Sequence, residues 1–475
     1  MAVKLPRGKK IVFIDWSFVA AGYGVAWTNE PEPFPQMMPS GVEIRVFRAH
    51  YAPEQVVITS DRPWESHSIN AYSTWFEDAG KFRLYYEPYT DLVKGDFSAR
   101  MAYAESDDGY NWTKPKLGLV PFGGSTNNNL ILAAENNFGR GPHGGHVFID
   151  ASAPADERYK LVHCAPHEEG GHFVSGAVSG DGIAWNALEK MVLRWWADTQ
   201  TVIIWDGTRG HYKGYFRGWE TGTLPGARRT VDHAVTKDFY NWPRPQQCLT
   251  TDANDPPGTD IYTNSFTPWP DALDAYLMFP CFYPRTSDTM ETHFAVSRDG
   301  RIWYRPVREP YLGAGQPDMD HYGGMVLGQG IISAEKGVWA MLASPRVTTH
   351  NQCFYDKDMP QHKSLSYVTI REDGFMAVEA EAEGEFWTVP LELEGDRLQV
   401  NAWAHFGGKV LVEVCDENGK PIEGYSLGEV VPLSGDCLFE QASFQGRSDL
   451  AELRGRPVRL HFKLTRARLY SFRTV

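Results

Sequence analysis

The heptapeptide SDDGYNW, residues 106–112, decides the fold because it recurs along the chain. Later copies are SGDGIAW at 179–185, TKDFYNW at 236–242 and SRDGRIW at 297–303, followed by a degenerate fifth copy, REDGFMAV, at 371–378. The aspartates that the copies share lie 57 to 74 residues apart, an interval that suits one four-stranded blade with its loops. Five copies therefore predict a five-bladed β-propeller.

The phrase itself has a structural explanation. Asp and Gly favour a tight turn in which a residue without a side chain adopts positive φ, and the Trp three positions after the Gly packs between adjacent blades. Asp238 is followed by Phe239 in place of Gly, so the third turn must differ from the others. We give these aspartates no catalytic role.

The rest of the chain agrees with an all-β protein. Aromatic residues make up 13% of the sequence, and 45 Gly and 31 Pro favour many short strands joined by turns. From about residue 385 onward, alternating strands continue without the repeated phrase. We therefore predict a propeller over 1–384, the catalytic domain, and an antiparallel β-sandwich over 385–475.

Composition excludes several classes of partner. A formal net charge of −14 disfavours nucleic acid, whose binding depends on Lys and Arg that displace counterions. The sequence contains no run of 18 apolar residues, so we predict no membrane span. The six cysteines form no Cys-X-X-Cys pair. The N-terminal stretch is a poor signal peptide, so a cytoplasmic location is the simplest expectation, although a secreted protein without its leader would look the same.

Several local motifs resemble one group of enzymes. The opening KIVFIDWSFVA, the Arg62–Glu65 phrase RPWE, the Asp198–Gln200 phrase DTQ and the pair Gly374-Phe375 are similar to bacterial proteins related to glycoside hydrolase family 32. The likeness covers nearly the whole chain, and families 32 and 43 share the five-bladed propeller that it implies. Those families use three carboxylates around the propeller axis. Their motifs Trp-Met-Asn-Asp-Pro-Asn-Gly, Arg-Asp-Pro and Glu-Cys-Pro do not occur here, so their catalytic trio cannot be transferred by motif.

Inner strands of a propeller begin at the mouth of its central funnel, so equivalent positions in the blades indicate a site. Glycoside cleavage needs one carboxylic acid to protonate the leaving oxygen and a second carboxylate as base or nucleophile. Asp198 precedes the apolar run TVIIW and is the first candidate. Glu291, among apolar neighbours, is the predicted acid, and Asp260 is a third catalytic candidate.

Further polar residues at the same depth are expected to bind substrate. They are Glu65, His67, Asn70, His143, Arg217, Tyr262, Asp320 and His321. We predict no metal or other cofactor, with one alternative left open: His67, His143, His146 and His321 together could hold a divalent ion.

The sequence thus predicts an exo-acting glycosidase that removes a terminal sugar from a small glycoside or oligosaccharide by carboxylate acid and base chemistry in the funnel. Two alternatives remain. One is a non-catalytic carbohydrate-binding propeller, and the other is a glycoside phosphorylase in which Arg228 and Arg229 bind phosphate. A small carbohydrate is the expected partner, and homo-oligomer formation stays open.

Overall fold

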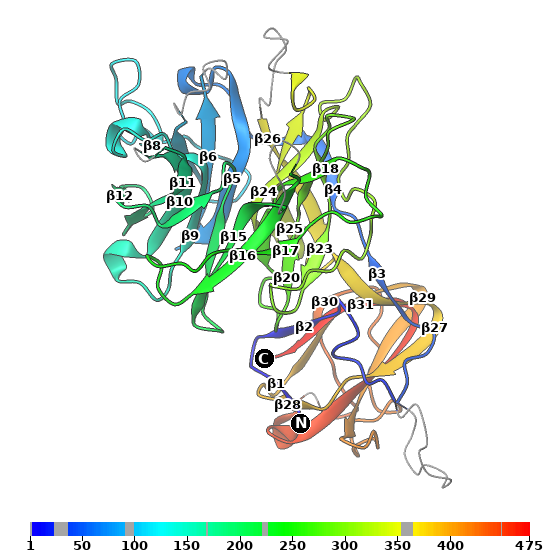
Figure 1. Ribbon diagram of the computed structural model, residues 1–475. Coiled ribbons are helices and arrows are strands. Elements are labelled where there is room, and N and C mark those ends of the chain that lie inside the picture. The colour runs from blue at the N-terminus through cyan, green and yellow to red at the C-terminus, as the bar shows by residue number, and fades with distance from the viewer. Residues whose placement is uncertain are drawn as a thin grey trace. The chain divides into compact units, whose positions relative to one another are not determined.

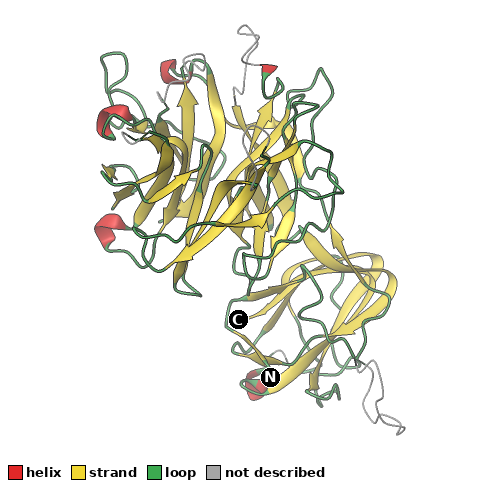
Figure 2. Cartoon of the chain, viewed as in Figure 1, coloured by secondary structure: helices red, strands yellow, loops and turns green. Residues whose placement is uncertain are grey.

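The computed structural model describes residues 2–22, 37–90, 99–167, 170–220, 227–352, 364–447 and 449–475. Strands dominate these residues, and the helical elements are single 3₁₀ turns (Figure 2). The turns are η1 (Pro63–Glu65), η2 (Ala134–Asn136), η3 (Ala155–Glu157) and η4 (Ala451–Leu453). None of the described helices is long and apolar enough to cross a membrane. The all-β class expected from the sequence is confirmed.

The chain divides into two compact units that are not consecutive stretches. Unit 1 comprises Met1–Arg48, Pro268–Ala275 and Ile370–Val475, and unit 2 comprises Ala49–Thr267 and Tyr276–Thr369. The division differs from the single cut after residue 384 because strands at both ends of the chain pair with one another, as described below. Their partnership could not be read from local patterning.

Unit 2 is the propeller. Its strands form five successive antiparallel groups (Figure 1). Blade one contains β5 (Ser68–Asp78), β6 (Lys81–Tyr89), β7 (Met101–Ser106) and β8 (Leu130–Leu132). Blade two contains β9 (His143–Ile149), β10 (Tyr159–Pro166), β11 (His172–Ser179), β12 (Asn186–Ala187) and β13 (Leu193–Trp196). Blade three contains β14 (Val202–Asp206), β15 (His211–Trp219), β16 (Arg229–Thr236) and β17 (Gln246–Leu249).

Blade four is split into two short sheets. One consists of β18 (Thr259–Thr263), β21 (Cys281–Pro284) and β22 (Glu291–Thr292). The other consists of β19 (Phe266–Pro268), β20 (Tyr276–Met278) and β23 (Ala295–Ser297). Blade five contains β24 (Gly324–Glu335), β25 (Val338–Arg346), β26 (Ser364–Arg371) and β4 (His50–Thr59).

Blade five joins the two ends of unit 2. Its outer strand β4 comes from the start of the unit and pairs with β26, which comes from the end. Its inner strand β24 runs parallel to β5 of blade one, where Gln329 lies opposite Thr74. The first and last blades are therefore bonded to each other, which fixes the positions of the inner strands.

The repeated phrases form the turns expected of them. In the copies at Asp108, Asp181 and Asp299, the carboxylate accepts backbone N–H groups two and three residues later. The following glycines have φ of 77°, 78° and 75°. Trp112 stacks on Trp75 of blade one and donates its indole N–H to the Tyr367 hydroxyl of blade five at 2.9 Å. The predicted packing between blades is confirmed.

The third and fifth copies depart from this pattern. Phe239, which replaces the glycine, is buried against Phe148 and Tyr212, so packing takes the place of conformational freedom. Asp373 of the fifth copy belongs to unit 1, where it is fully buried and accepts hydrogen bonds from Lys10 and Trp269 at 2.9 and 2.8 Å.

Unit 1 is the sandwich, and both ends of the chain build it. Its strands are β1 (Val3–Leu5), β2 (Lys10–Val12), β3 (Glu43–Val46), β27 (Met376–Trp387), β28 (Leu391–Leu393), β29 (Leu398–Asp416), β30 (Asp436–Gln441) and β31 (Pro457–Thr474). β1 pairs with β28, β2 with β31 and β3 with β27. The N-terminal segment was predicted to belong to the propeller, and these pairings place it in the sandwich instead.

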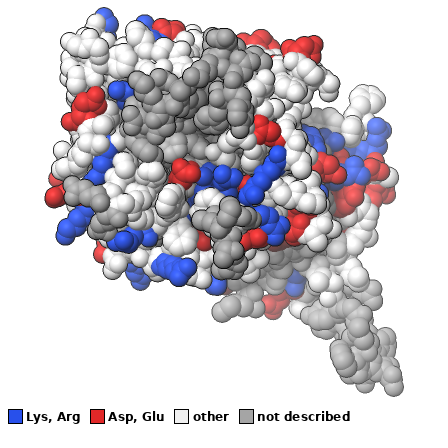
Figure 3. All heavy atoms as spheres, turned by 45° about the horizontal axis from the view of Figure 1, so that its top comes forward, with Lys and Arg blue, Asp and Glu red and all other residues white. Residues whose placement is uncertain are grey.

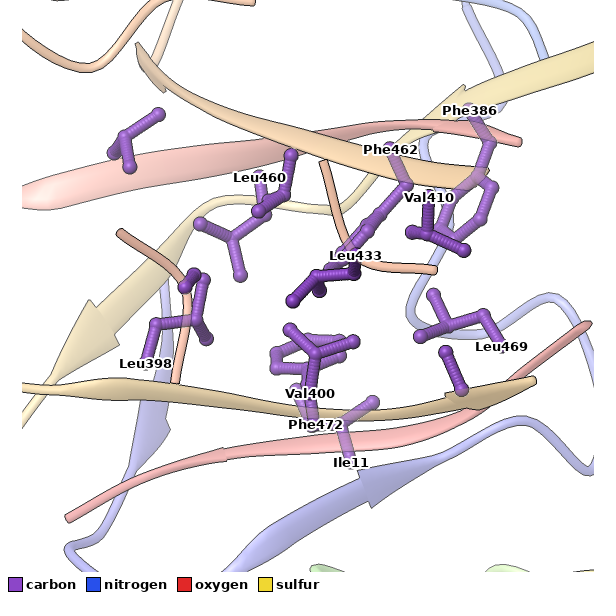
Figure 4. Packing of buried hydrophobic residues seen from close by; sticks show 14 of the residues in the cluster. Ile11, Phe386, Leu398, Val400, Val410, Leu433, Leu460, Phe462, Leu469 and Phe472 are labelled. Carbon is purple, nitrogen blue, oxygen red and sulfur yellow. The ribbon is translucent and has the colours of Figure 1, made fainter. Parts of the chain in front are cut away.

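Long strands let one sheet enclose a core. The pairing of β29 with β31 shifts register between Ala404 and Lys409, an irregularity of the kind that bends a strand. Figure 4 shows Leu460 and Phe462 on one side of the core and Phe472 on the other, although all three belong to β31. β31 therefore contributes to both layers. The five described cysteines of the protein are free thiols.

Candidate functional site

Asp198 lies immediately before the inner strand of blade three, at a point that also ties blades one and two. The neighbouring Thr199 hydroxyl bonds to Tyr72 of β5 at 3.1 Å, and the Gln200 amide donates to backbone carbonyls of β5 and β9 at 3.1 and 3.2 Å. Asp198 itself has φ of 38°, a conformation that non-glycine residues rarely adopt and that is enriched at functional sites. The DTQ phrase thus fixes Asp198 at the meeting of three inner strands.

Arg217 orients the Asp198 carboxylate. Its guanidinium, on β15, donates to Asp198 Oδ2 at 3.0 Å and to the Tyr262 carbonyl at 3.0 Å. The Arg217 side chain is 1% exposed, whereas that of Asp198 is 45% exposed. The guanidinium also lies 4.5 Å from the centre of the Tyr262 ring. This arrangement presents an accessible carboxylate on a buried and rigid support.

Glu87 and His143 form a second pair, and the histidine is within electrostatic reach of Asp198. Glu87, on β6, is fully buried and accepts the Gly144 N–H at 2.8 Å. Its other oxygen lies 2.8 Å from His143 Nδ1. Burial lowers the pKa of His143, but the charge of Glu87 and its hydrogen bond raise it more, so that the pKa exceeds the ordinary value.

The glycines after His143 explain this placement. A Cβ at Gly144 would lie 2.5 Å from the Thr199 backbone, and one at Gly145 would lie 2.4 Å from the sulfur of Met101. Gly144 also has φ of 65°. Only glycine at these positions lets the start of β9 approach its neighbours closely enough for His143 to lie near Asp198.

Asp260 has a different environment. Its carboxylate is fully buried and accepts Arg285 at 2.9 Å, the Arg229 backbone N–H at 2.9 Å and the Arg229 side chain at 2.5 Å. Burial alone would raise its pKa, but these hydrogen bonds and charges lower it below the ordinary value. No oxygen of Asp260 is exposed to a substrate. The structure therefore does not place Asp260 as the sequence predicted, and its contacts are those of a residue that positions two arginines.

Glu291 occupies β22 of blade four and is partly exposed. It accepts the Thr289 hydroxyl at 3.1 Å, and burial raises its pKa above the ordinary value. A carboxyl group with a raised pKa can hold a proton at higher pH than usual, as a general acid must. The acid role of Glu291 stays a prediction, and its described hydrogen bond does not link it to Asp198.

Two predicted substrate ligands of blade one face the protein interior. Glu65 is fully buried between the Tyr86 hydroxyl at 2.6 Å and Lys114 at 2.7 Å, and also accepts two backbone N–H groups of the preceding turn. The RPWE phrase thus forms η1 and fastens it to the blade. His67 is partly buried, and its Nε2 is enclosed without a hydrogen-bond partner.

The other predicted ligands fall into two groups. Asn70 donates to the Tyr89 hydroxyl at 3.2 Å, next to Glu87, and the Tyr262 hydroxyl bonds to His350 Nε2 at 3.0 Å. Both therefore belong to the group around Asp198. Asp320 and His321 instead bond to each other at 2.8 Å and contact Tyr51 of β4. They form a separate cluster.

Metal binding by histidines has no support from the part of the chain that the structure describes. Its residues contain no group of three or more His, Cys, Asp and Glu side chains placed to hold an ion. His146, one of the four candidates, uses both ring nitrogens to bond Thr74 at 3.0 Å and the Ile203 carbonyl at 2.9 Å. Burial lowers its pKa to about 3.

The arginines proposed as phosphate ligands lie in ion pairs. Arg228 pairs with Glu220 at 2.8 Å, so both arginines proposed as phosphate ligands, Arg228 and Arg229, already have carboxylate partners. Figure 3 shows Lys and Arg side chains near the middle of one face with acidic side chains beside them. This pattern does not favour the phosphorylase alternative.

Sequence reasoning missed several members of the group around Asp198. They are Tyr72, Tyr89 and His172. Arg285, which holds Asp260 together with Arg229, was also missed. Tyr72 and Tyr89 each lie two residues from a mouth residue on the same strand, Asn70 and Glu87. Alternation along a strand could have indicated both, because such pairs share one face.

Comparisons with known proteins support the fold. No family model and no curated protein matches the sequence. Among solved structures, one titled "Glycoside hydrolase" is similar with a TM-score of 0.50 at 14% identity, over 68% of this chain and 92% of that one. A thermostable family-43 glycoside hydrolase is similar with a TM-score of 0.46 at 12% identity, over 69% and 96%.

A family 43 arabinoxylan arabinofuranohydrolase from Bacillus subtilis matches over 89% of this chain and 99% of that one, with 11% identity and a TM-score of 0.42. At such low sequence identities, these similarities concern the fold alone. At the level of the fold, the predicted similarity to five-bladed propellers of the glycoside hydrolase kind is confirmed. The protein has the five-bladed propeller and β-sandwich architecture found among glycoside hydrolases.

Proposed function

We propose that the protein is a glycoside hydrolase that removes a terminal sugar from a small glycoside or oligosaccharide at the mouth of the propeller. The observation that supports this most is the accessible Asp198 carboxylate, held by the buried Arg217 where the inner strands of three blades meet. Such a rigid carboxylate can accept a proton from an attacking water.

The aromatic and polar groups around Asp198 suit a sugar. Tyr262 and His143 are partly exposed and come from two different blades, and together they offer an aromatic ring and hydrogen-bonding groups. Sugars combine apolar ring faces with many hydroxyl groups, so a mixed lining of this type can fix their orientation. Glu291 is a second candidate carboxylate because its raised pKa suits proton donation.

Turnover on a panel of aryl glycosides and of plant and algal oligosaccharides tests the proposal. We expect release of a single sugar from the chain end, seen by chromatography of the products, and no dependence on inorganic phosphate. Binding of sugars without cleavage by the wild-type protein would favour the non-catalytic propeller instead. Cleavage that requires phosphate would favour a phosphorylase.

A further inference from the structure

The hydrogen bonds around Glu87 determine which nitrogen of His143 can exchange a proton. The Tyr89 hydroxyl donates to Glu87 Oε1 at 2.5 Å, so its oxygen is left as an acceptor, which Asn70 meets at 3.2 Å. His143 Nδ1 lies 2.8 Å from that same Glu87 oxygen and 3.0 Å from the Tyr89 oxygen. Because Nδ1 faces two acceptors, it must hold a hydrogen. Nε2 is then the nitrogen that gains and loses a proton.

This is the arrangement that a carboxylate imposes on a histidine that transfers protons. A carboxylate bonded to one ring nitrogen fixes the tautomer, orients the ring and stabilises the imidazolium. Glu87 can do this firmly because it is fully buried and also bonded to the Gly144 N–H, next to His143 itself. The His143 side chain is 19% exposed, so part of it remains accessible.

Charged and titratable groups surround His143 on several strands. Glu87 and Tyr89 come from β6, Tyr72 from β5, His163 from β10, His172 from β11, Arg217 from β15 and Asp198 from the segment before β14. Burial and Arg217 lower the pKa of the imidazole, whereas Glu87 and Asp198 raise it, and the net change is upward. An imidazolium is therefore present at higher pH than in a free histidine.

We propose that His143 is the residue that donates a proton to the leaving group, and that Glu87 is its positioning residue. This inference rests on the proposed function. In the step, His143 Nε2 gives its proton to the glycosidic oxygen while the bond from that oxygen to the anomeric carbon breaks. Water attacks the anomeric carbon and loses a proton to Asp198, and solvent then restores both groups. The role predicted for Glu291 passes to this histidine.

Leaving groups of different acidity test the assignment. A leaving group that departs without protonation makes the acid unnecessary. We therefore expect His143→Gln to lose about 10²- to 10⁴-fold in kcat/KM on alkyl or sugar leaving groups, but less than about 10-fold on a dinitrophenyl glycoside. Glu291→Gln should not show this selectivity. His211→Gln, at the far end of β15, serves as the control and should retain wild-type rates.

The role of Glu87 has its own readout. The acid must be protonated, so activity falls as pH rises through the pKa of His143. Without the Glu87 charge that pKa drops, and Glu87→Gln should shift the alkaline limb of the kcat/KM profile toward lower pH. Nitrogen-15 NMR of the wild-type protein should show a hydrogen on His143 Nδ1 throughout and titration at Nε2, with no substrate needed.

The outcomes are distinct. If the wild type cleaves glycosides while His143→Gln loses the same factor on every leaving group, or if NMR finds the hydrogen fixed on Nε2, the assignment is overturned and the proposed function stands. If the wild type cleaves no glycoside of the panel, the proposed function fails and the assignment fails with it. If the loss of kcat/KM depends on the leaving group in Glu291→Gln and not in His143→Gln, Glu291 is the acid.

Discussion

The two ends of each blade differ in what they preserve. At the turn end, Asp108, Asp181 and Asp299 accept the same backbone N–H groups, and each is followed by a glycine at nearly the same φ. At the mouth, the blades supply an asparagine, a histidine, an aspartate and a tyrosine at comparable places. Repetition marks what every blade needs to fold, whereas the site lies where the repetition is lost.

We expect the largest difference between the mouth and the turn end of the blades when an Asp→Asn substitution is made at each. Asp198→Asn should lower kcat/KM by about 10²- to 10⁴-fold, because it removes the proposed base. Its stability should fall by at most about 1 kcal/mol, since the carboxylate is 45% exposed and an amide still accepts a bond from Arg217. Asp181→Asn is the matched control at a turn. Kinetics and thermal unfolding of both variants check the contrast, which fails if Asp181→Asn loses as much activity as Asp198→Asn.

The third turn shows that one structural need can be met in two ways. Phe239 packs against Phe148, Tyr212 and Tyr240 where other copies have a glycine. Phe239→Ala should therefore cost about 3 kcal/mol of unfolding free energy, the ordinary loss for a buried Phe. Denaturant unfolding measures it. Activity per folded molecule should not change, and a variant as stable as the wild type would show that Phe239 is replaceable.

A substitution of Asp260 tests whether this buried carboxylate is needed for stability. Asp260→Asn leaves Arg229 and Arg285 without a charged partner, and we expect a loss of about 2 to 3 kcal/mol, reduced from the value for a fully buried pair because both arginines are partly exposed.

The lowered pKa of Asp260 determines how its contribution to stability changes with pH. The folded pKa of Asp260 is lowered, so its contribution is complete above the unfolded value of about 3.9 and is lost as pH falls toward the folded value. Asp260→Asn should flatten the acid limb of the stability curve. Equal acid sensitivity in both proteins would contradict the ion-pair account.

The sequence could predict whatever repeats. The phrase around Asp108 and Gly109 is local, so the turns, the number of blades and the packing of Trp112 follow from spacing and turn chemistry. Alternation along strands could also place Asn70 and His143 at the mouth.

Long-range partnership could not be predicted in this way. Nothing near Asp260 shows that Arg285 will meet it, and nothing near Lys10 shows that β2 will pair with β31. Glu87 has the same limitation, because its partner His143 follows 56 residues later. The exposure of a candidate carboxylate depends on such distant partners, which is why the sequence could name both Asp198 and Asp260 as catalytic candidates although one is 45% exposed and the other is fully buried.

The smallest effect concerns two glycines with positive φ, one in a repeated turn and one outside any turn. Gly182 and Gly118 have φ of 78° and 75°, so alanine is strained at either position by about 1 to 2 kcal/mol. They differ in space: a Cβ at Gly182 would lie 2.6 Å from the Tyr85 hydroxyl oxygen, whereas a Cβ at Gly118 meets no atom within 4 Å. Gly182→Ala should therefore cost more than Gly118→Ala, and neither should alter kcat/KM. Thermal unfolding of the two variants separates backbone strain from blade packing. If both lose the same stability, conformation alone accounts for the glycine, and the close fit between blades contributes nothing to its selection.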